Sequence, residues 1–281
     1  MQTDYVQRFL FENLDIRGRL VCLTQAWQSM LAGRGYPDDI VCLLGHTTAL
    51  NVLLGANQKG AGRVTLQVQG SGPVKLLVAD CTAELKIRGM ASFEPEKASF
   101  PSQRGLLGDG RLAVTLEDVK SGGLYQSLVP LEGETLEQIF MHYLQQSEQV
   151  PAYLRLYAND DALAGLLLEK LPGADKRDPD GWSRVTHFAN TLTLEETRDA
   201  QPYDLLTRVF PEELMRVFRL YPVEYHCPYD EDKVKDMLRV LGRGEVEAIL
   251  AEQGEVVIRN EMCNHEYRFD AGAIARLFAT H

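Results

Sequence analysis

Hydrophobic and polar residues alternate with a period of two in several segments between residues 64 and 116, a pattern typical of half-buried β-strands. The first of these segments reads Val64-Thr65-Leu66-Gln67-Val68-Gln69. Similar segments, separated by glycine-rich turns, follow at 74–79, 83–88 and 112–116. The pattern predicts an antiparallel meander.

Elsewhere the apolar positions recur every three to four residues, the period of an amphipathic α-helix. One such helix is predicted to start at Asp38 or Asp39, either of which can cap it, and to end near Gly55. Another follows Thr135, which makes a capping box with Gln138. Helices and strands together predict an N-terminal α+β domain with an antiparallel sheet over residues 1–172.

A polar, turn-rich segment at residues 171–181 is the best candidate for a linker. Beyond it, the chain from Trp182 to Tyr221 carries apolar faces at helical spacing, and Pro202 and Pro211 suit helix starts. We therefore predict a helical linker over residues 173–222. Its apolar faces are expected to pack against the N-terminal domain. The alternative is that this packing is marginal, so that its detachment would expose protein-binding surface.

The last segment, residues 223–281, has the pattern of a small α+β module. Its apolar spacing predicts two helices, then two short strands and a last helix. The first helix begins at Asp230 or Asp232 and ends at Gly242, and the second ends at Gly254. The strands are 256–258 and 267–269, and the last helix begins at Asp270. A module this small lies near the limit for folding on one hydrophobic core, which is why such modules often bind a metal.

The composition is that of an ordinary globular protein, with 45% hydrophobic and 25% charged residues among 281. A total of 29 lysines and arginines against 40 aspartates and glutamates leaves a net charge of −11. This charge opposes binding to nucleic acid or to an anionic membrane. Because the N-terminus lacks a basic segment followed by an apolar one, and no apolar run of about 18 residues occurs, we expect a cytoplasmic protein.

The sequence offers little that is typical of a catalytic site. Gly70-Ser71-Gly72 and Gly108-Asp109-Gly110 lie between predicted strands with no helix after them, so they indicate hairpin turns rather than phosphate-binding loops. His265-Glu266 lacks the second histidine of a zinc-protease helix, and no GxSxG or CxxC motif occurs. We therefore do not expect an enzyme.

Five cysteines are spread over the chain, an odd number that argues against a framework of structural disulfides. Cys22, Cys42 and Cys81 each lie among apolar residues and are interpreted as small core residues. Cys227 and Cys263 differ from them, since each lies in a short motif in the last fifth of the chain. These motifs are Tyr225-His226-Cys227-Pro228 and Asn260-Glu261-Met262-Cys263. A zinc site made of cysteines alone needs four thiolates, and the two motifs supply two.

Short motifs in a characteristic order extend over nearly the whole chain. They are Arg8-Phe9-Leu10-Phe11-Glu12 with Arg17-Gly18, Gln67-Val68-Gln69-Gly70-Ser71-Gly72-Pro73, Arg88-Gly89-Met90-Ala91, Leu131-Glu132-Gly133-Glu134-Thr135, Tyr143-Leu144-Gln145-Gln146-Ser147-Glu148-Gln149-Val150-Pro151, Ile249-Leu250-Ala251-Glu252-Gln253-Gly254-Glu255, and Cys263-Asn264 with Tyr267 and Phe269. By their order and spacing, the chain resembles the bacterial 33-kDa heat-shock protein family of redox-regulated holdase chaperones.

The resemblance implies an N-terminal mixed domain, a helical linker and a C-terminal zinc module with a CxC and a CxxC motif. In that family the reduced module binds zinc, whereas oxidation forms a disulfide within each pair, releases the metal and exposes hydrophobic surface. In this chain Tyr225 stands at the first cysteine of CxC, and Asn260 at the first cysteine of CxxC. Cys227 and Cys263 therefore have no partner within their own motifs, and the family chemistry cannot run unchanged.

Three interpretations of Cys227 and Cys263 stay open. Both can be small residues in turns held by ordinary packing. They can form a disulfide or dithiol switch with each other if the fold brings the two turns together. They can also bind zinc together with His226 or His265. His265 is the better placed histidine, because a residue two positions after Cys263 lies on the same side of an extended segment.

The resemblance implies an ATP-independent holdase that binds unfolding client proteins under stress through hydrophobic surface, either as a monomer or as a homodimer. Because the zinc switch is incomplete, we expect heat, acid or a constitutive equilibrium to set the activity, with little response to peroxide alone. The alternative is a thiol-based sensor or interaction module without holdase activity. No cofactor is certain, and zinc is one open alternative.

Overall fold

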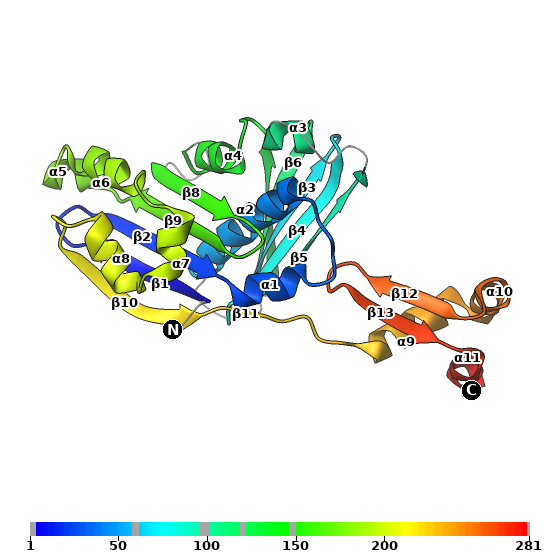
Figure 1. Cartoon of the computed structure of the whole chain (residues 1–281). Coiled ribbons are helices and arrows are strands. Elements are labelled where there is room, and N and C mark those ends of the chain that lie inside the picture. The colour runs from blue at the N-terminus through cyan, green and yellow to red at the C-terminus, as the bar shows by residue number, and fades with distance from the viewer. Residues whose placement is uncertain (1–3, 58–61, 96–101, 119–121, 146–149, 280–281) are drawn as a thin grey trace. The chain divides into compact units, whose positions relative to one another are not determined.

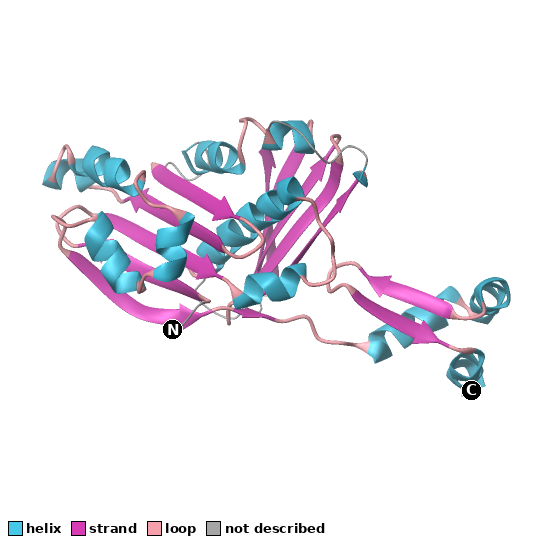
Figure 2. Ribbon diagram, viewed as in Figure 1, coloured by secondary structure: helices cyan, strands magenta, loops and turns pink. Residues whose placement is uncertain are grey.

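The computed structural model describes residues 4–57, 62–95, 102–118, 122–145 and 150–279. The chain divides into two compact units, Met1–His226 and Cys227–His281. Each unit contains both helices and strands (Figure 2). The α+β class predicted from the sequence is therefore confirmed. None of the helices in the described part of the chain is long and apolar enough to span a membrane.

Two sheets build the first unit. Their strands are β1 (Tyr5–Phe11), β2 (Ile16–Leu23), β3 (Gly62–Gly70), β4 (Val74–Thr82), β5 (Lys86–Phe93), β6 (Gly110–Asp118), β7 (Gly123–Pro130), β8 (Ala152–Ala158), β9 (Leu163–Lys170), β10 (Met215–Pro222) and β11 (Glu224–Tyr225). The five-stranded sheet has the order β10-β1-β2-β9-β8, and the six-stranded sheet has the order β11-β5-β4-β3-β6-β7. Only the short β11–β5 pairing is parallel among the described strands.

The meander predicted from the alternating pattern is present with two differences. β3, β4 and β5 pair in sequence, but β6 pairs with the other side of β3 instead of following β5. The strand expected over 83–88 begins only at Lys86. The residues before it form a turn in which the N–H of Leu85 donates to the carbonyl of Thr82, with Leu85 at a φ of +60°.

The helices of the first unit are α1 (Gln25–Leu31), α2 (Asp38–Gly55), α3 (Gln103–Leu107), α4 (Leu136–Tyr143), α5 (Ala174–Arg177), α6 (Gly181–Ala189), α7 (Leu194–Asp199) and α8 (Pro202–Val209). The longest, α2, packs against strands of both sheets (Figure 1) and is buried on nearly all sides. It ends at Gly55 as predicted, although the residue before it is Pro37 and no side chain caps it. The predicted cap of α4 is confirmed, since the hydroxyl of Thr135 accepts from the N–H of Gln138.

Three short helices cover the other face of the five-stranded sheet. We call α6, α7 and α8 the helical cover. Figure 1 shows α7 and α8 lying over the sheet that contains β1 and β2. The predicted helical character of the linker is thus confirmed for most of its length, and its helices pack within the first unit.

The helical prediction is wrong for the last part of the 173–222 linker. Met215–Pro222 forms strand β10, which pairs antiparallel with β1. Its hydrogen-bonding partners lie more than 200 positions earlier in the chain, at Tyr5–Phe11, so nothing in the local sequence indicates them. Tertiary pairing overrides the local helical pattern here.

The second unit contains α9 (Glu231–Leu241), α10 (Arg243–Gln253), β12 (Val256–Asn260), β13 (His265–Phe269) and α11 (Ala271–Ala279). Asp230 caps α9 by accepting from the N–H of Lys233 at 3.0 Å, and Asp270 accepts from the N–H of Ala273 at 2.6 Å. These boundaries agree with those predicted from the sequence. Its small core consists of Leu238, Val246, Val256, Tyr267, Phe269, Ile274 and Leu277.

Candidate functional site

Cys227 and Cys263 are joined by a disulfide within the second unit. Their Cα atoms lie 5.5 Å apart, a separation typical of disulfides. Cys263 is buried and Cys227 is half-buried. The structure therefore brings together the two cysteines that the sequence singled out, and the bond ties the segment before α9 to the turn between β12 and β13.

Asn260 shapes the turn that holds Cys263. Its side-chain oxygen accepts from the N–H groups of Met262 and Cys263, at 3.1 and 3.3 Å. The N–H of Cys263 also donates to the carbonyl of Asn260. An asparagine side chain that bonds to the backbone two residues ahead is a common way to form a turn. The residue that stands at the first position of the family's CxxC motif thus holds this turn through hydrogen bonds.

Neither histidine completes a metal site in this arrangement. His265 lies beside the rings of Tyr229 and Tyr267, and its Nδ1 is buried without a hydrogen-bond partner among the described residues. The segment between Cys263 and His265 is not extended, since Asn264 has a φ of +56°. The prediction that Cys263 and His265 lie on one side of an extended segment is therefore wrong.

The donors present do not fit a zinc ion. Each sulfur of the Cys227–Cys263 pair is bonded to the other, so neither is a thiolate ligand. His226 is exposed, and its backbone N–H donates to the carbonyl of Ile87. Among the residues described by the structure, no three histidine, cysteine, aspartate or glutamate side chains form a group that could hold a metal.

The three remaining cysteines are free thiols in the first unit. Cys22 and Cys81 are buried, and burial raises the pKa of each thiol to about 12. Cys42 is half-buried with its sulfur 3.6 Å from Nε2 of His46. Burial raises the pKa of Cys42 and lowers that of His46 to about 4, so the pair is neutral and not a thiolate–imidazolium pair. These cysteines are poor nucleophiles, as expected for core residues.

A continuous apolar interface joins the five-stranded sheet to the helical cover. The sheet side and its loops contribute Tyr5, Phe9, Phe11, Leu14, Ile16, Leu20, Cys22, Leu166 and Leu168. The cover and the residues that flank its helices contribute Val185, Ala189, Leu192, Leu205, Leu206, Val209 and Phe210. The ring of Phe210 lies 5.0 Å from that of Phe11 and 6.2 Å from that of Phe9, measured between centroids. Removing the cover would therefore expose a broad face rich in aromatic side chains.

Three tyrosine hydroxyls tie the sheet to the cover. Tyr157 donates to the carbonyl of Leu192 at 2.6 Å, and Tyr153 donates to the side chain of Asn190 at 2.8 Å. Tyr5 donates to the carbonyl of Thr197 at 3.3 Å. These three hydrogen bonds connect the two sides of the apolar interface. The sequence analysis did not identify these tyrosines, because only the fold shows which backbone groups they reach.

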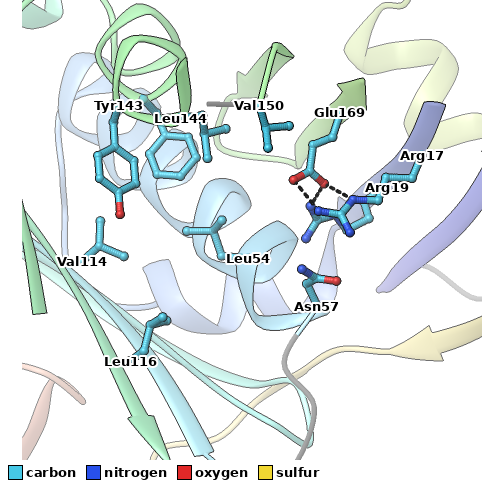
Figure 3. A pocket seen from close by; sticks show the side chains of 11 residues that line it. Arg17, Arg19, Leu54, Asn57, Val114, Leu116, Tyr143, Leu144, Val150 and Glu169 are labelled. Carbon is cyan, nitrogen blue, oxygen red and sulfur yellow. Dashed lines mark hydrogen bonds and ion pairs between the residues drawn. The ribbon is translucent and has the colours of Figure 1, made fainter. Parts of the chain in front are cut away.

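A pocket of about 210 Å³ lies where α2 ends, between the five-stranded sheet, β6 and α4 (Figure 3). The carboxylate of Glu169 is bound there by Arg17 and Arg19, and Arg19 also donates to the carbonyl of Leu53 near the end of α2. Burial alone would raise the pKa of Glu169, but the two guanidinium groups outweigh it and lower this pKa. The cluster of Arg17, Arg19 and Glu169 ties β2 to β9 and to α2, so it has a structural role.

Comparison with known proteins identifies the family. A model of the Hsp33 protein family matches residues 4–270. The chain belongs to the Hsp33 family. It is 38% identical to the 33 kDa chaperonin of Methylobacillus flagellatus over 99% of this chain and 95% of the relative. It is 36% identical to the 33 kDa chaperonin of Shewanella loihica over 99% of this chain and 96% of the relative.

The fold is also that of an Hsp33 homologue. The crystal structure of the 33 kDa chaperonin from Thermotoga maritima superposes with a TM-score of 0.81 and covers 98% of this chain and 97% of that one, at 22% identity. The resemblance found in the sequence motifs is thus confirmed. Membership in a family whose relatives are named chaperonins supports a chaperone function for this protein.

Proposed function

We propose that this Hsp33 family member is an ATP-independent holdase that binds unfolding proteins under stress. The observation that carries the proposal is the apolar face of the five-stranded sheet beneath the helical cover. Its aromatic and aliphatic side chains would bind exposed apolar segments of a client, since burying such surface is favourable and does not depend on direction. Function here is binding, and no catalytic step is proposed.

The helical cover has the properties of a removable element. Its helices, α6, α7 and α8, contain 9, 6 and 8 residues. Helices shorter than about 12 residues are marginal in water, so these persist mainly through their contact with the sheet. A client that replaces those contacts shifts the population towards an open state that already exists at a low level.

The proposed regulation differs from that implied for the family. The disulfide here joins the two motifs, Cys227 to Cys263, instead of joining two cysteines within each motif. A switch that needs four thiolates and zinc cannot operate with this set of donors. We therefore propose that heat, acid or a constitutive opening equilibrium sets holdase activity, and that peroxide alone has little effect.

The proposed partners are unfolding proteins in the cytoplasm. A net charge of −11 opposes binding to nucleic acid or to anionic membranes. Three free cysteines suit a reducing compartment, where a disulfide such as Cys227–Cys263 is usually transient or redox-sensing. The disulfide also favours the second candidate function, a thiol-based sensor whose output is the binding of a specific partner.

Light scattering from a heat-unfolding client tests the proposal and separates the two candidates. A holdase suppresses aggregation in proportion to its molar ratio to the client, without ATP, whereas a thiol sensor leaves aggregation unchanged. The assay is run with wild type, Cys227→Ser and Cys263→Ser, each before and after peroxide. Strong peroxide-dependent suppression that either substitution abolishes would contradict the proposed regulation. Absence of suppression by wild type under every condition would contradict the holdase function itself.

A further inference from the structure

The outer strands of the two sheets are protected to very different degrees. An unpaired edge of a sheet offers a row of backbone N–H and C=O groups to any other extended chain, and proteins usually block such edges. At the edge formed by β8, the N–H of Leu156 donates to the carboxylate of Glu137 in α4 at 2.7 Å. At the edge formed by β10, Arg216 and Arg219 are exposed and the strand ends at Pro222.

β7 ends at a proline too, Pro130, but it lacks both the exposed arginines of β10 and the carboxylate that caps β8. It ends the six-stranded sheet, and among the described strands it pairs only with β6. The strand contains no charged residue from Gly123 to Pro130. Leu124, Tyr125 and Leu128 are 67%, 66% and 54% exposed, which is unusual for large apolar side chains. This edge is long, uncharged and apolar, which are the properties that promote pairing with another strand.

The register fixes which side chains a new strand would meet. Leu124 pairs with Glu117 of β6, and Leu128 pairs with Ala113. Because side chains alternate along a strand, Leu124 and Leu128 lie on the same face, four residues apart. An added strand with apolar residues at alternate positions would place one beside each leucine.

We propose that the edge of β7 between Leu124 and Leu128 binds an extended, uncharged segment of an unfolding protein by adding it to the sheet as a further strand. The proposal rests on the holdase function above and names the kind of segment bound. Backbone hydrogen bonds do not depend on the client's sequence, and they suit a protein that must bind many clients. A second copy of this chain is a poorer occupant, because each copy carries a charge of −11 and the two would repel.

This site differs from the sheet face beneath the helical cover. It is accessible while the cover is closed, and it recognises backbone as well as apolar side chains. It would therefore make the first contact with a client. The face beneath the cover would follow when the client displaces α6–α8.

Substitution of the two leucines by lysine tests the edge. Lysine on an edge strand disfavours strand addition, and both sites are exposed enough for the fold to tolerate it. The probe is fluorescently labelled lysozyme that has been reduced and carboxymethylated, so that it stays unfolded. We expect the Leu124→Lys/Leu128→Lys variant to bind it about five- to tenfold more weakly than wild type. The control is Val240→Lys, in α9, which replaces an 89% exposed apolar residue that lies on a helix.

Hydrogen exchange supplies a second readout on the unmodified protein. If the probe adds a strand, amides of β7 gain protection when it binds, whereas contacts through side chains alone leave them exchanging as before. Equal affinity of wild type and the double lysine variant, or unchanged exchange in β7, would overturn the edge proposal. A wild-type dimer that the double lysine variant converts to a monomer would overturn it too, by assigning β7 to a second copy. Loss of probe binding by wild type would instead count against the holdase function.

Discussion

The two faces of the five-stranded sheet are built in opposite ways. One face packs against α2, an 18-residue helix that lies between both sheets and is buried on nearly all sides. The other face packs against the helical cover, three helices of at most 9 residues that each bury one side. The first face belongs to a core shared by two sheets, whereas the second is closed by a single thin layer.

A unit built in this way can be stable and still expose apolar surface. Opening the α2 face would separate two sheets and requires unfolding of the whole unit. Opening the cover removes only the contacts between the five-stranded sheet and the helical cover, and the strands of both sheets stay paired. We therefore expect equal damage to the two faces to have unequal consequences.

The largest effect is expected from removing one leucine on each face. Leu50 in α2 and Leu206 in α8 are both nearly fully buried, so Leu→Ala costs about 2–5 kcal/mol at either site. We expect Leu50→Ala to lower the free energy of unfolding of the whole first unit, as measured in urea. Leu206→Ala should instead raise holdase activity at temperatures where wild type is inactive. If both variants lose stability globally and neither gains activity, the distinction between the faces fails.

The second unit differs from both faces, because its core is small and it is crosslinked by the Cys227–Cys263 disulfide. The chain-entropy model gives about 3–4 kcal/mol for a bond between residues 36 positions apart. We expect Cys227→Ser and Cys263→Ser to make the second unit sensitive to proteolysis to the same extent, while the first unit keeps its unfolding transition. Cys42→Ser, which removes a free half-buried thiol, serves as the control. Unequal effects of the two substitutions would show that the residues matter for reasons other than the bond.

Acid should act on the α2 face through His46. Burial lowers the pKa of this histidine to about 4, so the folded state binds a proton less readily than the unfolded state. Its neutral form therefore supports the fold fully above pH 6.5, and stability is lost as the pH falls from 6.5 towards 4. The loss is about 3 kcal/mol, because one pKa unit corresponds to about 1.4 kcal/mol.

The measurement for His46 is the pH dependence of urea unfolding in wild type and His46→Gln. Gln103 donates to Nδ1 of His46 while its oxygen accepts from the N–H of Leu136, so a neutral side chain at position 46 is compatible with its neighbours. We expect the slope between pH 6.5 and 4 to decrease in the variant. A slope that stays the same would assign the acid sensitivity to other groups.

The smallest effect is expected at the hydroxyl groups that tie the sheet to the cover. Tyr157→Phe removes the hydrogen bond to the carbonyl of Leu192 and should weaken the closed cover by about 1 kcal/mol. Holdase activity should then begin at a lower temperature than in wild type. Tyr143→Phe, in α4 and away from the cover, should leave the onset unchanged. An identical shift in both variants would indicate general destabilisation.

Much of the fold was predictable because local patterns and tertiary structure agree. The alternation around Val64 and Val68 gives β3, α2 ends at Gly55, and Asp230 caps α9. The prediction failed where distant pairing decides the structure. Met215–Pro222 follows a run of helices and becomes a strand only because β1 provides its hydrogen bonds.

The sequence indicated which residues form the candidate site, but not how these residues are bonded. The motifs around Cys227 and Cys263 drew attention to both cysteines, yet simple packing, a disulfide and a zinc site were all compatible with the sequence. The choice depends on the turn that Asn260 forms and on the left-handed backbone at Asn264, which moves His265 away from an extended arrangement. The hydrogen bonds from Tyr5, Tyr153 and Tyr157 to the cover left no signal in the sequence, because only the fold shows which groups these hydroxyls reach.

Native-state hydrogen exchange of the wild-type protein measures whether the helical cover opens while the rest of the first unit stays folded. Amides of α6, α7 and α8 report the free energy of opening the cover, and amides of α2 report that of unfolding the unit. We expect the cover to exchange with an opening free energy several kcal/mol below that of α2. Warming to the temperature at which holdase activity begins should lower the opening free energy of the cover before it lowers that of α2. Equal opening free energies for the cover and α2 would contradict the claim that the cover opens on its own.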